Sequence, residues 1–221
     1  MPTHTPSPQR GECAGHIYRF DAAPADAPVP AARVILALHG TGGDENDLLP
    51  IIRRIDPHSP VLSPRGNVRE SVMLRFFRRF EEGIFDEGDV VSRSGDLAAF
   101  VAEATRLLGV EGLPVMAVGY SNGANVAASL AMLHPQVLAG GILLRSMMPL
   151  SAPPAHPLAG RYLLLSGQFD TICPPLRVEV LAKHLREHGA EVSLEWMSAG
   201  HELTSDDLLV AQEWLNASTT T

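Results

Sequence analysis

The stretch Gly119-Tyr120-Ser121-Asn122-Gly123 decides how this chain is interpreted. It follows the apolar run of residues 114–118, which has the length and composition of a buried strand, and it precedes an alanine-rich helical segment at 124–133. A Gly-x-Ser-x-Gly motif between a strand and a helix predicts a tight turn that projects the serine oxygen from the carboxyl end of a sheet. Ser121 is therefore the candidate nucleophile.

Outward from that motif, short apolar runs alternate with segments of helical period, which predicts βαβ units around a mostly parallel sheet with helices on both faces. Residues 63–95 lack a clean period, as either a long loop beside a site or a decorated surface loop would. The expected strands are 16–20, 34–38, 114–118, 138–144, 162–165 and 192–196, and the expected helices are 96–108, 124–133, 176–188 and 204–215.

Length and composition set further limits. The chain has 221 residues, 45% of them hydrophobic, which suits a single domain over 13–215 with disordered tails at 1–12 and 216–221 and a surface connection at 22–32. A net charge of −8, with no basic cluster beyond 75–79, argues against binding to nucleic acid or to an anionic membrane. No apolar run suits a membrane span or a signal peptide, so we expect a cytoplasmic protein whose Cys13 and Cys173 are free thiols.

A serine hydroxyl needs a base, and the base needs an orienting group, usually a carboxylate. Among the histidines after Ser121, only His201 lies in a loop of small residues after a late strand; His134 more simply caps a helix, and His156 lies in a Pro-rich loop. Asp170 is the one acidic candidate that follows a strand end. Without Ser121 and His201, the simpler interpretation of Asp170 would be a turn residue or a helix N-cap. The order serine, acid, histidine predicts a triad of Ser121, Asp170 and His201.

Negative charge that develops on a tetrahedral intermediate needs hydrogen-bond donors. The backbone N–H of Asn122 is one candidate, and the N–H of Thr41, in the glycine-rich stretch 39–43 after an early strand, is the other. The same glycines could serve backbone geometry alone. A phosphate loop is the weaker interpretation, since no Gly-Lys-Ser/Thr follows and three acidic residues do.

A competing motif, His-x-x-Glu-His, spans residues 184–188 and could place two imidazoles one turn apart as zinc ligands. The alternative is a solvated helix whose histidines lie on the flank of its apolar stripe, near the favourable C-terminus. No third ligand is evident in the sequence. We therefore favour the solvated helix and predict no metal.

Four motifs in order, at 38–43, 119–123, 167–170 and 200–201, make the chain resemble the phospholipase/carboxylesterase family of α/β-hydrolases, which includes acyl-protein thioesterases and small bacterial carboxylesterases. Residues 65–67 and 76–89 look most like a bacterial subgroup associated with quinone and hydroquinone resistance. The resemblance implies an α/β-hydrolase fold with a minimal cap and no cofactor. It also implies ester or thioester hydrolysis through an acyl-enzyme on Ser121, with His201 as base and then acid, Asp170 orienting it, and donors from Thr41 and Asn122.

One departure from the family pattern and one comparison with a neighbouring family narrow the implied substrate and reaction. Thioesterase relatives usually carry Gln-Gly after the serine, whereas this chain has Asn122-Gly123, which disfavours a lipidated-protein substrate. Dienelactone hydrolases share the architecture but use a cysteine nucleophile, so Ser121 speaks against that reaction.

For the substrate we expect a short to medium, largely uncharged acyl ester, because no basic cluster is evidently placed beside the triad. A homodimer is compatible with the sequence, and a non-catalytic ligand-binding protein of the same fold is the alternative function, although such proteins typically lose a triad member. Five apolar residues could line an acyl pocket or equally belong to the core: Phe76, Phe77, Phe85, Met147 and Met148.

Overall fold

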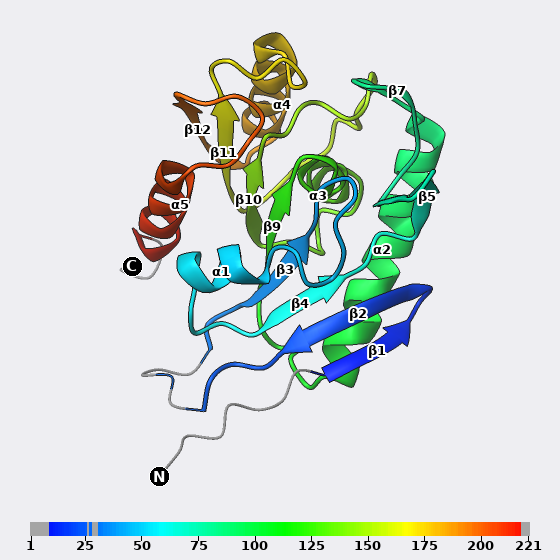
Figure 1. The fold of residues 1–221 in the computed structure, drawn as a ribbon, viewed down its shortest axis with the longest axis vertical. Coiled ribbons are helices and arrows are strands. Elements are labelled where there is room, and N and C mark those ends of the chain that lie inside the picture. The colour runs from blue at the N-terminus through cyan, green and yellow to red at the C-terminus, as the bar shows by residue number, and fades with distance from the viewer. Residues whose placement is uncertain (1–8, 26, 28–30, 218–221) are drawn as a thin grey trace.

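A twisted central sheet of eight strands organises the molecule (Figure 1), and the computed structural model describes residues 9–25, 27 and 31–217. All strands from β4 onward in the sheet order run parallel, and the first two pair antiparallel at one edge. This confirms the α/β class and the mostly parallel sheet. The order is β1 (Gln9–Cys13), β2 (His16–Asp21), β4 (Val61–Pro64), β3 (Val34–Leu38), β9 (Val115–Tyr120), β10 (Gly140–Leu144), β11 (Arg161–Gly167) and β12 (Glu191–Met197).

Helices cover both faces of this sheet, as the alternating pattern predicts. Helices α1 (Leu49–Ile55) and α5 (Ser205–Ala217) pack together on one face, and α2 (Glu87–Leu107), α3 (Asn122–Leu133) and α4 (Pro175–Glu187) lie on the other (Figure 1). Each face of the sheet has its own apolar core. In β3, Ile35 lies in the core under α1 and α5, and its neighbour Leu36 lies in the core under α2, α3 and α4. Burial on both faces is why the central strands read as continuous apolar runs.

The parallel strands bring four loops to one edge of the sheet. The loops that follow β3, β9, β11 and β12 carry Thr41, Ser121, Asp170 and His201 respectively. Because the carboxyl ends of parallel strands meet at the same edge, these positions converge although they span 160 residues of sequence.

Helix α2 begins at Glu87, well before the expected start at residue 96. Asp86 explains the early start, because its side chain caps the helix by accepting a hydrogen bond from the backbone N–H of Asp89 at 3.1 Å. The short elements α1 and β4 were not among the predicted ones.

Residues 65–86 form two small hairpins instead of the expected long loop. Strands β5 (Val68–Glu70) and β6 (Met73–Arg75) make the first, and β7 (Arg79–Glu81) and β8 (Ile84–Phe85) the second. Each hairpin is its own two-stranded sheet, separate from the central one. We call residues 65–86 the hairpin segment.

The ends of the described chain differ from the expected tails. Residues 9–12, expected to be disordered, pair with β2 as part of β1, and residues 216–217 belong to the last turn of α5. The rest of both predicted tails, 1–8 and 218–221, lies outside the described residues, as do residues 26 and 28–30 of the predicted connection. Both cysteines are free and buried. Among the described residues, no helix combines the length and apolar character needed to span a bilayer.

Candidate active site

Ser121 occupies a strained turn between β9 and α3. Its φ of 53° and ψ of −115° are unusual for a residue with a side chain, and its N–H donates to the Leu144 carbonyl at 2.9 Å. A Cβ on Gly119 would lie 2.6 Å from the carbonyl oxygen of Gly123, and one on Gly123 would collide with the carbonyl of Leu38. The two glycines of the motif are therefore needed because backbone approaches backbone on both sides of the turn.

Three side chains form one hydrogen-bonded chain at this turn. His201 Nε2 lies 2.9 Å from Ser121 Oγ, and His201 Nδ1 lies 2.8 Å from Asp170 Oδ2. Since a carboxylate can only accept, Nδ1 carries the proton, which leaves Nε2 free to accept the hydroxyl proton of Ser121. The structure thus brings together the three residues that the sequence nominated.

Asp170 is held at both oxygens. Its other carboxylate oxygen, Oδ1, accepts hydrogen bonds from the backbone N–H groups of Ile172 and Cys173 at 2.8 and 2.9 Å. The carboxylate is almost completely buried, with 1% of its side chain exposed, whereas 20% of the His201 side chain is exposed. The imidazole of His201 is therefore partly exposed to solvent, while its Nδ1 is bonded to the fixed Asp170 carboxylate.

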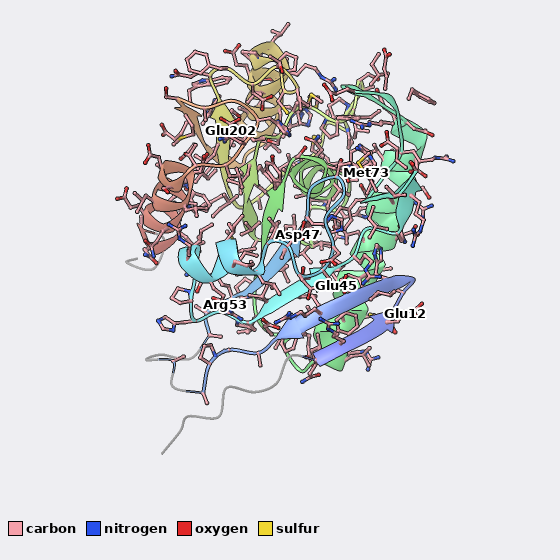
Figure 2. All side chains as sticks on the ribbon, viewed as in Figure 1. Glu12, Glu45, Asp47, Arg53, Met73 and Glu202 are labelled. Carbon is pink, nitrogen blue, oxygen red and sulfur yellow. The ribbon has the colours of Figure 1, made fainter. Side chains whose placement is uncertain are left out.

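Arg145 holds the loop that carries His201. Its Nε donates to the Gly200 carbonyl at 2.9 Å and its Nη2 to the Glu202 carbonyl at 2.7 Å, so the guanidinium grips the residues on either side of His201. Glu202 lies on the loop between β12 and α5 (Figure 2). The Arg145 charge is neutralised by Asp207 of α5 through two bonds of 2.7 and 2.9 Å, and neither side chain has any exposed surface.

Tyr120 adds a third support to the same loop. Its hydroxyl donates to the His201 carbonyl at 3.0 Å, and its ring lies 5.5 Å from the imidazole, measured between centroids. Burial raises the pKa of Tyr120, so the hydroxyl keeps the proton that it donates.

The two predicted oxyanion donors lie beside Ser121, and the hairpin segment holds both of their residues. Asn122 is the first residue of α3, so its N–H has no intrahelical partner, and the N–H of Thr41 donates to no other described residue. The Asn122 side-chain oxygen accepts from the Phe76 N–H at 2.7 Å, and Thr41 Oγ1 accepts from Arg75 Nη1 at 2.6 Å.

His39 ties the loop after β3 to the start of the hairpin segment. Its Nδ1 donates to the Gly40 carbonyl at 2.7 Å, and its Nε2 accepts from the Gly66 N–H at 2.9 Å, an arrangement that requires the neutral ring. Burial lowers the pKa of His39 and favours that form. Met73, on β6, lies beside the same loop (Figure 2), where the Gly42 N–H donates to the Leu74 carbonyl at 2.9 Å.

A small cavity of about 30 Å³ opens beside Ser121. Of the five apolar residues proposed for a pocket, Phe85 and Met147 line this cavity, whereas Phe76, Phe77 and Met148 are buried in the core and do not. The expectation that no basic cluster lies beside the triad is wrong, because two arginines of the hairpin segment line the same cavity. The full lining is Thr41, Arg75, Arg79, Glu82, Gly83, Phe85, Ser121, Asn122, Asn125, Met147, Ile172 and Cys173.

The two histidines of the competing motif lie at the end of α4 and one residue beyond it, and neither belongs to a group of three potential metal ligands among the described residues. His188 Nδ1 donates to the His184 carbonyl at 2.8 Å and the two rings stack with centroids 4.1 Å apart, as on an ordinary helix end. In the part of the chain that the structure describes, the one group of three potential ligands is Asp170, Cys173 and His201. Burial raises the pKa of Cys173 to about 12, so its sulfur remains a neutral thiol, and the other two residues are bonded to each other.

Sequence reasoning missed Tyr120, Arg145, Arg75 and Arg79. A signal existed for Arg145, since a charged residue directly follows the apolar run that ends at Leu144. The two arginines of the hairpin segment belong to the one basic cluster of the sequence, whose position beside the serine only the fold reveals.

Comparisons with known proteins agree with this geometry, although no protein-family model matches the chain. MhqD of Bacillus subtilis (strain 168), whose name describes it only as a hydrolase, is 43% identical over 182 residues, which cover 82% of this chain and 91% of that protein. The carboxylesterase of Bacillus cereus superposes with a TM-score of 0.86 at 38% identity, covering 92% of this chain and 94% of that one. The carboxylesterase of Mesorhizobium loti gives 0.84 at 32% identity, covering 96% and 99%. The chain therefore belongs to the phospholipase/carboxylesterase family of α/β-hydrolases and is a hydrolase of the carboxylesterase type.

Proposed function

We propose that the protein hydrolyses carboxylic esters or thioesters of short to medium acyl groups through an acyl-enzyme on Ser121. The observation that carries the proposal is the continuous hydrogen-bonded chain from Ser121 Oγ through His201 to Asp170, with distances of 2.9 and 2.8 Å. Such an arrangement activates a serine that would otherwise be a poor nucleophile.

In the first half of the reaction, Ser121 Oγ attacks the acyl carbon and its proton moves to His201 Nε2. The carbonyl oxygen becomes an oxyanion, which accepts hydrogen bonds from the N–H groups of Thr41 and Asn122. Collapse of this intermediate breaks the bond to the alcohol or thiol, which leaves with the proton from His201. Asp170 stays ionised throughout and stabilises the imidazolium.

In the second half, water replaces the alcohol. His201 takes a proton from water, whose oxygen attacks the acyl-enzyme, and the same two N–H groups donate hydrogen bonds to the second oxyanion. The proton then returns to Ser121 Oγ as the carboxylic acid leaves. No group other than water is consumed, so the residues of this chain suffice for the complete cycle.

The size of the cavity favours the short end of the acyl range. A cavity of about 30 Å³ beside Ser121 has room for a few carbon atoms, far less than a pocket for a drug-sized ligand. Phe85 and Met147 supply its apolar surface. Related carboxylesterases favour this catalytic role over the non-catalytic alternative. A cytoplasmic location and a homodimer remain predictions from the sequence.

Labelling with a fluorophosphonate probe tests the proposal. The wild type, Ser121→Ala, His201→Ala and the control Ser92→Ala, which alters an exposed serine on α2, are treated in parallel, and the adduct is located by mass spectrometry. We expect an adduct on Ser121 in the wild type and in Ser92→Ala only. A folded wild type that neither takes up the probe nor cleaves 4-nitrophenyl acetate, butyrate or octanoate would contradict the proposal.

A further inference from the structure

Two arginines line both the cavity at Ser121 and a second hollow in the hairpin segment. Arg75 and Arg79 line the small cavity beside the serine. The same two residues line a larger hollow of about 150 Å³, together with Val68, Arg69, Glu70 and Arg78. Arg75 and Arg79 are therefore shared by the two spaces, and the larger space is bounded by four arginines, one glutamate and one valine.

The hydrogen bonds of these two arginines leave donors unused. Glu70 lies 3.3 Å from Nε of Arg75 and accepts from Nε of Arg79 at 3.0 and 3.1 Å, so one carboxylate is shared between two guanidiniums. The Nε of Arg75 also donates to the Phe77 carbonyl, and its Nη1 donates to Thr41 Oγ1. Within the described residues, Nη2 of Arg75 and both Nη atoms of Arg79 have no hydrogen-bond partner.

Arg75 and Arg79 are largely shielded from solvent, which strengthens the electrostatic effect of their charges. Only 3% of the Arg75 side chain and 20% of the Arg79 side chain are exposed, whereas Glu70, at 38%, lies toward the solvent. Burial, and then the neighbouring charge of Arg79, lower the pKa of Arg75 to about 10, so the group is still protonated at neutral pH. Glu82 lines the cavity beside Ser121 and reduces the net charge there. Arg78 is already paired with Asp86 at 3.2 Å.

We propose that Arg75 and Arg79 form a subsite for a carboxylate of the ester substrate, which deepens the proposed function and rests on it. The guanidinium fork matches a carboxylate, and Glu70 shows that the two side chains are spaced so that one carboxylate can reach both. The hydrolysis itself is unchanged: water adds across the acyl bond, and the second carboxylate keeps its charge. The favoured substrates are short esters that carry a carboxylate, such as a half-ester of a dicarboxylic acid.

A matched pair of substrates isolates the charge. Mono-4-nitrophenyl glutarate and 4-nitrophenyl valerate have acyl chains of equal length and the same leaving group, and only the first is anionic. The measured quantity is the ratio of their kcat/KM values. We expect the wild type to favour the glutarate, and Arg79→Gln to lower the ratio by about tenfold or more, the size of a lost charge-assisted hydrogen bond. Arg79→Lys keeps the charge but not the guanidinium fork, so its ratio should lie between those of the wild type and Arg79→Gln.

The control is Arg106→Gln, which removes an exposed arginine on α2 and should leave the ratio unchanged. A second pair, 4-acetoxybenzoate and phenyl acetate, carries the charge on the leaving group instead. A preference that depends on Arg79 in either pair supports the subsite, and the pair that shows it tells which part of the ester carries the carboxylate. Thermal unfolding of each variant verifies that it is folded.

The proposal is overturned if the wild type cleaves the neutral esters but prefers neither anionic one, or if Arg79→Gln leaves both ratios unchanged. That result would leave the proposed function intact, because ester hydrolysis would still be observed. Absence of hydrolysis of all four esters, together with absence of fluorophosphonate labelling, would instead remove the proposed function and the subsite with it.

Discussion

The two sides of Ser121 are held in different ways. On the side of the proposed base, the loop of His201 is fixed by Arg145, whose ion pair with Asp207 is completely buried between the sheet and α5. On the side of the proposed oxyanion donors, the loop after β3 is held by Arg75, which comes from the hairpin segment at the periphery. The proposed base is thus coupled to the folding of the whole domain, whereas the proposed donors are coupled to a segment that also lines the cavity beside Ser121.

Removal of the proposed base should have the largest effect. We expect His201→Ala to lower kcat/KM for 4-nitrophenyl butyrate by about 10³-fold or more, because among the described residues no other side chain is hydrogen-bonded to Ser121 Oγ. The control is His58→Ala, which removes an exposed histidine that does not line the cavity beside Ser121. Comparable losses in the two variants would show that His201 is not the base.

Arg145→Met removes the buried ion pair that supports the loop of His201. The substitution leaves the Asp207 carboxylate buried without its partner, which should lower the free energy of unfolding by about 3–5 kcal/mol, measured by urea denaturation. In the double variant Arg145→Met/Asp207→Asn no charge is left unpaired, and the asparagine can still accept from Thr204, as Asp207 does at 2.8 Å. We expect stability to recover in the double variant while kcat stays low, because the carbonyls of Gly200 and Glu202 are no longer held.

Recovery of both stability and kcat in that double variant would argue that Arg145 serves stability alone. Recovery of stability without kcat would identify Arg145 as a positioning residue for His201. The variant therefore separates the two roles that the buried ion pair combines.

Arg75→Met should act on rate more than on stability. It removes the donor to Thr41 Oγ1, and we expect kcat for neutral esters to fall by about tenfold, the cost of a loosened oxyanion donor. Thr41→Val removes the same hydrogen bond from the other end. If the bond transmits the effect, the double variant should be no slower than the slower single variant, and additive losses in kcat would contradict this coupling.

The smallest expected effect is a loss of stability at acidic pH, which arises from His39 and His16 near the loop after β3 and the hairpin segment. Burial lowers the pKa of His39 and of His16 below the usual value of 6.5, so both stay neutral in the folded protein and take up protons more readily when it unfolds. Their contribution to stability is present above about pH 6.5 and declines as the pH falls below it toward their lowered pKa values. Protonation of His39 also removes the acceptor of the Gly66 N–H.

The measurement is the urea midpoint between pH 8 and pH 5, for the wild type and for His16→Gln. The urea concentration at the midpoint should decrease as the pH is lowered below 6.5, and this decrease should be less steep in the variant. A midpoint that rises on acidification would contradict the assigned direction of both pKa shifts.

The apolar central strands and the clustering of Ser121, Asp170 and His201 were predictable because each has a local signature. Strand β3 was predicted with its observed bounds, and Ser121, Asp170 and His201 each follow a strand end within a recognisable motif. Strand β8, with two residues, is too short to show a period, and β1 is mostly polar and exposed, so it lacks the apolar run that marks β3. For Arg145 the sequence marks only a charge directly after an apolar run, and its role could not be predicted because its partner Asp207 lies 62 residues away.

The separation of the hairpin segment from the central sheet has a consequence for protein engineering. Since its strands share no ladder with that sheet, the segment can be exchanged as a cassette between homologues without a change of strand register. A chimera would have to preserve the contacts between the segment and the rest of the domain, and it would then acquire the charge preference of the homologue that supplies the hairpins. Those contacts include Phe76 N–H to Asn122, Arg75 to Thr41, Arg78 N–H to Asp89, the Gly83 carbonyl to Arg177, Gly66 N–H to His39, the Leu74 carbonyl to Gly42, and Arg65 to Glu45.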